Sequence, residues 1–296
     1  MAPKFSVIGD SISTLKGTMP DDWRIHYEGE VHVDGIERQQ DTWWGRIIDH
    51  FGGELLRNSS YSGSVVEGFG FPAAVSDERI NYLVGDDGEQ PDVVLFFMGI
   101  NDYGWAGGRN QVMGGSASAS AKPEDLGEPY EVTDIADADA LQRFEDAYAL
   151  VLKKTRAVAP DAQVWCVNLA PGTVPNTDWP NFIYRIRGIE LDDYNAAIAR
   201  AAAAQGAHVA DVRAFGLSYD SVDGTHPSAL GMEQIACMVI AQMEGGSTDP
   251  ADYPLLANAP KAVRGCYEDN CAGCEFADIQ KARWSLYCSK FDPNKL

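Results

Sequence analysis

The chain has 296 residues, enough for one large domain or two small ones, and its 45% hydrophobic and 23% charged residues are ordinary for a globular protein. Its 44 Asp and Glu against 23 Lys and Arg give a formal net charge of −21 at pH 7. Such a charge disfavours nucleic acid, anionic membrane surfaces and polyanionic substrates as partners. No segment approaches the roughly 20 apolar residues that span a bilayer, so we expect no membrane partner.

Short apolar runs alternate with helical patterns along most of the chain. In chain order the sequence predicts strands near 4–9, 54–58, 92–98, 162–168 and 207–211, and helices near 41–51, 76–84, 139–159, 190–205 and 228–244. Strands separated by helices indicate parallel crossover connections, and therefore an α/β fold built as a three-layer α/β/α sandwich.

The first predicted strand begins within a few residues of Met1 and leaves no room for a signal peptide. Either the protein is cytoplasmic or a leader has been removed. We favour a cytoplasmic location.

Four polar signatures accompany the predicted strands. They are Gly9-Asp10-Ser11-Ile12, Asn58 with Ser62-Gly63, Gly99-Ile100-Asn101-Asp102, and Asp223-Gly224-Thr225-His226-Pro227. Three of them follow a predicted strand directly, and the last lies downstream of the fifth strand. Because ligands of parallel sheets bind beyond the carboxyl ends of the strands, these signatures are expected at an active site.

Together the signatures supply the groups that acyl transfer through a serine needs. Ser11 can be the nucleophile, His226 the general base that accepts its proton, and Asp223 the group that orients the imidazole. The backbone N–H groups of Ser11 and Gly63 and the side-chain amide of Asn101 can form an oxyanion hole. We expect no cofactor for this catalysis.

Other polar residues near the signatures receive a structural interpretation. Asp10 and Asp102 are expected to hydrogen-bond loop backbones rather than to act as acid or base. The remaining histidines lack the sequence context of the fourth signature and are expected to be structural: His26, His32, His50 and His208.

On these signatures the chain resembles an SGNH hydrolase of the GDSL esterase/lipase superfamily, from residue 4 to about 244. The first block has Ile12 where the family name has Leu. The resemblance implies a flavodoxin-like, parallel five-stranded sheet with strand order 2-1-3-4-5. The family's catalytic residues carry over to Ser11, Gly63, Asn101 and His226, with Asp223 three residues before the histidine.

Aromatic residues are frequent in the segments that follow the first four strands, which predicts an apolar or sugar-stacking cleft beside Ser11. We expect Trp105 and Tyr184 to contact substrate and most of the others to pack loops against the sheet. The long connection 104–139 is either a lid or a flexible insertion, and we favour the insertion.

The last part of the chain contains clustered cysteines. The sequence therefore divides into a hydrolase domain at 1–245 and a cysteine-rich extension at 246–296. With no secretion signal, four clustered thiols favour a structural zinc site over two disulfides, and an iron–sulfur cluster is a third reading. The predicted zinc ligands are Cys266, Cys271, Cys274 and Cys288.

Outside the extension, Cys166 and Cys237 are interpreted as buried small hydrophobic residues.

These observations predict an enzyme that hydrolyses small O-acyl esters, with a carbohydrate O-acetyl group as the preferred substrate. An acyltransferase using the same residues is the nearest alternative. A flavodoxin-like FMN-binding protein is an alternative of a different class, since the loop after the first strand is rich in Ser, Thr and Gly, but it leaves Asp223 and His226 without a role. A non-catalytic binding module is disfavoured because no catalytic group is missing.

Overall fold

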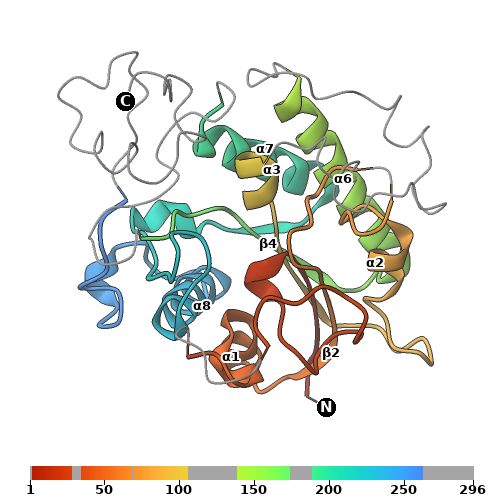
Figure 1. Ribbon diagram of the computed structural model, residues 1–296, viewed down its shortest axis with the longest axis horizontal. Helices are drawn as coiled ribbons and strands as arrows, with labels where there is room; N and C mark the ends of the chain where they lie inside the picture. The colour runs from red at the N-terminus through yellow and green to blue at the C-terminus, as the bar shows by residue number, and fades with distance from the viewer. Residues whose placement is uncertain (1, 29–34, 69, 106–138, 174–188, 263–296) are drawn as a thin grey trace.

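A computed structural model of the chain describes residues 2–28, 35–68, 70–105, 139–173 and 189–262 (Figure 1). Most of the 104–139 connection, Tyr184 and the four cysteines of the extension lie outside these ranges, so the predictions made for them stay predictions.

At the centre of the fold lies a parallel sheet whose five strands have the order β2-β1-β3-β4-β5. This confirms the α/β fold and the expected strand order. Its inner strands are almost continuously apolar because helices cover both of its faces. The strands are β1 (Lys4–Gly9), β2 (Glu54–Ser60), β3 (Val93–Phe97), β4 (Gln163–Val167) and β5 (His208–Ala210).

Helices cover the sheet in two layers, as predicted for a three-layer sandwich. One layer is formed by α1 (Trp43–His50) and α8 (Ala229–Met243), which pack against each other (Figure 1). The other layer contains α2 (Asp77–Asn81), α6 (Ala140–Val158) and α7 (Leu191–Gln205), shown in orange to green in Figure 1.

Local sequence signals explain where these helices begin and end. The Thr42 hydroxyl accepts a hydrogen bond from a backbone N–H in the first turn of α1, and Ser228 does the same for α8. Gly206 ends α7 at φ 65°, a conformation that glycine adopts without strain. Gly231 allows close packing, because an added Cβ would lie 1.9 Å from the carbonyl oxygen of Asp220.

The structure contains a short helix at the carboxyl edge of the sheet that the sequence analysis did not predict. Helix α3 (Ile100–Trp105) starts inside the third signature, directly after Gly99. Its first turn closes with a hydrogen bond from the Tyr103 N–H to the carbonyl of Gly99, at 2.9 Å. Six residues are too few to show a helical period in the sequence, which explains the omission.

The packed core continues past α8. Leu256 is 1% exposed and belongs to the hydrophobic core. The chain then pairs with the segment after β5, because the Ala262 N–H donates to Gly216 and the Ser218 N–H donates to Pro260, both at 2.8 Å. The described residues beyond 245 therefore pack on the hydrolase fold, and the division at 245/246 stays a prediction.

Candidate active site

The sheet has a topological switch point between β1 and β3. The chain leaves β1 toward β2 on one side, whereas β3 leads to β4 on the other, and ligands of parallel sheets typically bind at such a point, beyond the carboxyl ends of the strands. Ser11 starts the short 3-10 helix η1 (Ser11–Ser13) that follows β1, and Asn101 lies in the first turn of α3 after β3. The first and third signatures therefore lie beside each other at the switch point.

Three side chains from the first and fourth signatures form a continuous hydrogen-bonded relay. The Nε2 atom of His226 lies 2.9 Å from the Oγ atom of Ser11, and its Nδ1 atom lies 2.7 Å from Oδ2 of Asp223. A carboxylate accepts the Nδ1 proton, which leaves Nε2 free to accept the serine proton. Ser11 and His226 are 215 positions apart in the sequence.

Asp223 is held by its own loop. Its Oδ1 atom accepts hydrogen bonds from the backbone N–H groups of Thr225, at 2.9 Å, and His226, at 2.8 Å. Partial burial acts to raise the pKa of Asp223, but the hydrogen bond and charge of His226, together with the two N–H donors, outweigh it and lower the pKa to about 2. Asp223 is therefore an anion at neutral pH.

The loop that carries the histidine is braced on both sides. The Tyr219 hydroxyl donates to the carbonyl of Thr225 at 2.8 Å, and the Val222 N–H donates to the carbonyl of His226 at 2.9 Å. Gly224 takes φ 94°, a conformation that strains any residue with a side chain. These contacts fix the imidazole at the edge of the sheet.

The expected oxyanion donors follow the ends of neighbouring strands β1, β2 and β3 at the same edge of the sheet. The N–H groups of Ser11 and Gly63 donate to no acceptor among the described residues. Gly63 has φ 79°, and Asn101 donates one amide N–H to the carbonyl of Ser64 at 2.8 Å. Because a side-chain amide has two N–H bonds, Asn101 keeps one for a ligand.

Two buried carboxyl groups brace the neighbouring loops, as the sequence predicts. Asp10 accepts a hydrogen bond from the Ile12 N–H at 3.0 Å, and burial raises its pKa to about 6. Asp102 accepts hydrogen bonds from the N–H groups of Val66 and Glu67. Burial, and then the nearby charge of Glu67, raise the pKa of Asp102 to about 8.

Arg79 links the ends of two strands under the site. Its side chain is 0% exposed and donates to the carbonyl oxygens of Gly9, Ser59 and Pro72 and to the hydroxyl of Ser64. Burial lowers its pKa to about 9. The sequence analysis did not identify Arg79, because a single arginine on a short helix carries no motif.

The structure also brings a second histidine to the site. The ring of His26 is stacked on the ring of His226, with centroids 3.7 Å apart and an interplanar angle of 12°. The sequence offered no signal for this contact, since His26 belongs to none of the four signatures. Among the other histidines, His50 lies on α1 and His208 at the amino end of β5, and His32 is outside the described residues.

The aromatic residues divide into two groups. Trp23, Tyr61 and Phe71 are half-buried and contact one another, with ring centroids 5.1–6.3 Å apart. Tyr61 immediately precedes Ser62 and Gly63, so this cluster borders the oxyanion donors. Trp105 is the last residue of α3. A second group is fully buried and packs the core, as expected for most aromatics of these segments: Tyr27, Trp43, Trp44 and Tyr103.

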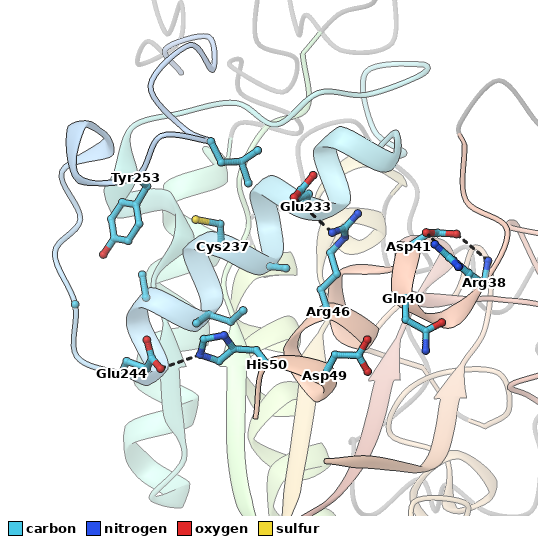
Figure 2. A pocket seen from close by; sticks show the side chains of 15 residues that line it. Arg38, Gln40, Asp41, Arg46, Asp49, His50, Glu233, Cys237, Glu244 and Tyr253 are labelled. Atoms are coloured by element: carbon cyan, nitrogen blue, oxygen red, sulfur yellow. Dashed lines mark hydrogen bonds and ion pairs between the residues drawn. The ribbon is translucent and has the colours of Figure 1, made fainter. Parts of the chain in front are cut away.

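A separate groove of about 620 Å³ lies between α1 and α8, away from the carboxyl edge of the sheet (Figure 2). Its charged walls are paired across the two helices, with Arg46 3.5 Å from Glu233 and His50 2.8 Å from Glu244. Cys237 lines the groove and is half-buried, whereas we expected it to be buried; Cys166 is buried, as predicted. None of the predicted catalytic residues lines this groove.

Within the described ranges, no group of three or more His, Cys, Asp or Glu residues is arranged to hold a metal ion. Nor is any helix of those ranges long and apolar enough to cross a bilayer.

A parallel α/β/α sandwich with a Ser–His–Asp relay at its switch point is the architecture of an acyl-transferring hydrolase. The family model for GDSL-like lipases and acylhydrolases matches residues 3–243, and the chain therefore belongs to this family of ester-bond hydrolases. No curated protein matches the chain significantly.

Solved structures share the fold. A candidate GDSL-like lipase from Bacteroides ovatus is 21% identical over 83% of this chain and 99% of its own, with a TM-score of 0.54. One from Bacteroides uniformis is also 21% identical, over 82% of this chain and 96% of its own, with a TM-score of 0.55. At this identity the similarity establishes the fold alone.

Proposed function

We propose that this hydrolase cleaves small O-acyl esters with Ser11 as nucleophile, His226 as general base and Asp223 as the group that orients and stabilises the imidazole. The observation that carries the proposal is the continuous relay from Asp223 through His226 to the Ser11 hydroxyl, with both contacts below 3 Å. A chain of hydrogen bonds from a serine hydroxyl through an imidazole to a carboxylate is the arrangement that activates a serine as a nucleophile.

In the proposed reaction the Ser11 Oγ attacks the ester carbonyl while its proton passes to Nε2 of His226. The carbonyl oxygen becomes an anion that the N–H groups of Ser11 and Gly63 and the amide of Asn101 stabilise. The imidazolium, stabilised by ionised Asp223, then protonates the departing alcohol. Water repeats the sequence on the acyl-enzyme and releases the acid.

A carbohydrate O-acetyl ester is our preferred substrate. Ser11 is 5% and Asn101 7% exposed, so the reacting carbonyl reaches them through a narrow approach, which favours a small acyl group. The half-buried cluster of Trp23, Tyr61 and Phe71 beside Gly63 offers ring faces against which a sugar can stack.

The alternatives use the site differently. An acyltransferase would use the same relay with an alcohol in place of water. An FMN-binding protein would have no need for the contact between His226 and Ser11. If the purified protein is colourless, the FMN-binding alternative is excluded. A cytoplasmic location stays a prediction.

The test combines a substrate series with a nucleophile variant. We expect p-nitrophenyl acetate to be cleaved faster than longer-chain esters, and acetylated sugars to release acetate. Ser11→Ala should reduce kcat by roughly 10⁴-fold or more while the melting temperature stays near that of the wild type. In the wild type, a fluorophosphonate probe should label Ser11 alone. The control variant Ser247→Ala, which changes an exposed serine, should be labelled at Ser11 to the same extent.

Labelling of another serine, or full turnover by Ser11→Ala, would contradict the mechanism. Release of acyl product on an added alcohol rather than as free acid would assign a transferase.

A further inference from the structure

The stacked pair of imidazoles has no part in the mechanism described so far. Acyl transfer through a serine needs one imidazole, and His226 supplies it. Yet the His26 ring lies nearly parallel to it, with centroids only 3.7 Å apart, so that the two rings are in face-to-face contact.

The segment that carries His26 is tied to both catalytic loops. The His26 N–H donates to the Thr14 hydroxyl at 2.9 Å, and that hydroxyl donates to the carbonyl of Ser11 at 3.0 Å. On the other side, the buried Tyr27 hydroxyl donates to the carbonyl of Pro227 at 2.9 Å, directly after His226. The ring of His26 therefore sits on a rigid support.

The same segment also reaches the oxyanion side. The Ser62 N–H donates to the carbonyl of Arg24 at 2.8 Å, immediately before Gly63. Residues 24–27 thus connect the nucleophile loop, the oxyanion loop and the histidine loop, which are far apart in the sequence.

The relay by itself restrains one motion of His226 only weakly. Both of its hydrogen bonds, to Asp223 and to Ser11, are made by ring nitrogens. A small turn of the ring about the Cβ–Cγ bond bends both hydrogen bonds before it breaks either, and it tilts the Nε2 lone pair away from the serine hydroxyl. A flat partner against one face prevents this rotation, because tilting would drive the rings into each other.

We propose that His26 is a positioning residue, whose ring face holds the imidazole of His226 in the plane of the relay. This inference rests on the proposed serine mechanism. In this role the face of the His26 ring contacts His226, and the His26 nitrogens take no part. Another flat aromatic side chain should therefore be able to replace His26, whereas a small side chain should not.

The experiment compares His26→Ala with His26→Phe in the full chain, with p-nitrophenyl acetate as substrate. Small misplacements of a catalytic group cost large factors in rate, so we expect His26→Ala to lower kcat by about 10-fold or more with little change in KM. His26→Phe should restore most of that loss. His208→Ala is the matched control, because it removes an imidazole stacked on Trp165, with centroids 4.6 Å apart, at the opposite edge of the sheet.

A second readout needs no substrate. The proton on Nδ1 of His226, bonded to Asp223, should give a sharp low-field proton resonance in the wild type and in His26→Phe, and a broadened one in His26→Ala. Melting temperatures show whether each variant is folded. If the wild type fails to cleave the ester, the proposed function fails, while the resonance still decides the role of His26.

Wild-type kcat and a sharp resonance in His26→Ala would overturn the inference. So would a His26→Phe variant as impaired as His26→Ala, since that result would assign the function to a ring nitrogen.

Discussion

At the scale of single residues, the carboxyl group of Asp223 and an imidazole ionise in different ranges of pH. The pKa of Asp223 is about 2, so its charge is constant across the range in which proteins are usually assayed. An imidazole ordinarily titrates near pH 6.5, within that range. A change of activity with pH near neutrality therefore does not report on the ionisation of Asp223.

The first prediction follows from this separation. We expect kcat/KM to rise with pH from the acid side and then level off, because only the neutral imidazole can accept the serine proton. Lowering the pH protonates the base and removes activity, whereas Asp223 stays ionised. The measurement is kcat/KM for p-nitrophenyl acetate between pH 4.5 and 8.5.

Asp10 is the control for this profile, because its pKa of about 6 falls in the same window. Asp10→Asn should keep the acid limb, with its midpoint moved to lower pH, because the substitution removes a negative charge that interacts with His226. A midpoint that disappears in Asp10→Asn, or a flat profile in the wild type, would argue against the histidine as base.

The sequence predicted the residues of the site that belong to motifs, and missed those that act through the fold. Ser11, Asn101 and His226 each stand in a recognisable signature at the end of a strand or in a loop. Arg79 and His26 have no such context. Their importance arises from contacts between segments that are distant in the sequence, and a single sequence carries no record of such contacts.

At the scale of elements, Arg79 couples helix α2 to the ends of β1 and β2. Its guanidinium lies 2.7 Å from the carbonyl oxygen of Gly9 and 2.6 Å from that of Ser59. Gly9 and Ser59 are buried, so water cannot replace the guanidinium as the donor to their carbonyl oxygens. The helix therefore sets the position of the backbone from which the nucleophile loop starts.

The second prediction tests this coupling. Arg79→Met should lower the free energy of unfolding by about 3–5 kcal/mol, because it leaves several buried carbonyl groups without donors. It should also lower kcat, since the loops that carry Ser11 and Gly63 lose a common anchor. Urea unfolding at pH 7 measures the first effect.

Arg200→Met provides the control with an exposed arginine. The side chain of Arg200 is 54% exposed and forms an ion pair with Glu145, and such surface pairs contribute at most about 1 kcal/mol. Equal destabilisation by the two substitutions would show that burial of Arg79 is not what matters.

Element boundaries were predictable where helices are long and end at clear sequence signals. Helices α6 and α8 were expected at 139–159 and 228–244, and the structure has them within a residue of those limits. Pro160 follows the end of α6, and the Ser228 side chain caps the start of α8, which explains the agreement. The short α3 lacks both signals, and tertiary contacts at the switch point define it instead.

At the scale of the whole molecule, the active site depends on the complete sheet. Ser11 follows β1 and His226 precedes α8, so the relay closes only when both ends of the hydrolase fold are in place. The described chain ends at Ala262, which pairs with Gly216 on the segment that leads toward the histidine loop. The described part of the extension, 246–262, is therefore anchored to the catalytic fold.

The last prediction concerns that extension. We expect about one zinc per chain, held by its four cysteine thiolates, because their C-x4-C-x2-C-x13-C spacing suits a Cys₄ zinc site. Elemental analysis of the full chain should lose this zinc in Cys271→Ser and retain it in the control Cys237→Ser. Because thiolate ligands must be deprotonated, chelation at low pH should release the metal while ester hydrolysis at neutral pH survives, since the extension supplies no catalytic group. Absence of metal together with a mass lower by two hydrogens per bonded pair would assign disulfides instead, and would count against a cytoplasmic location.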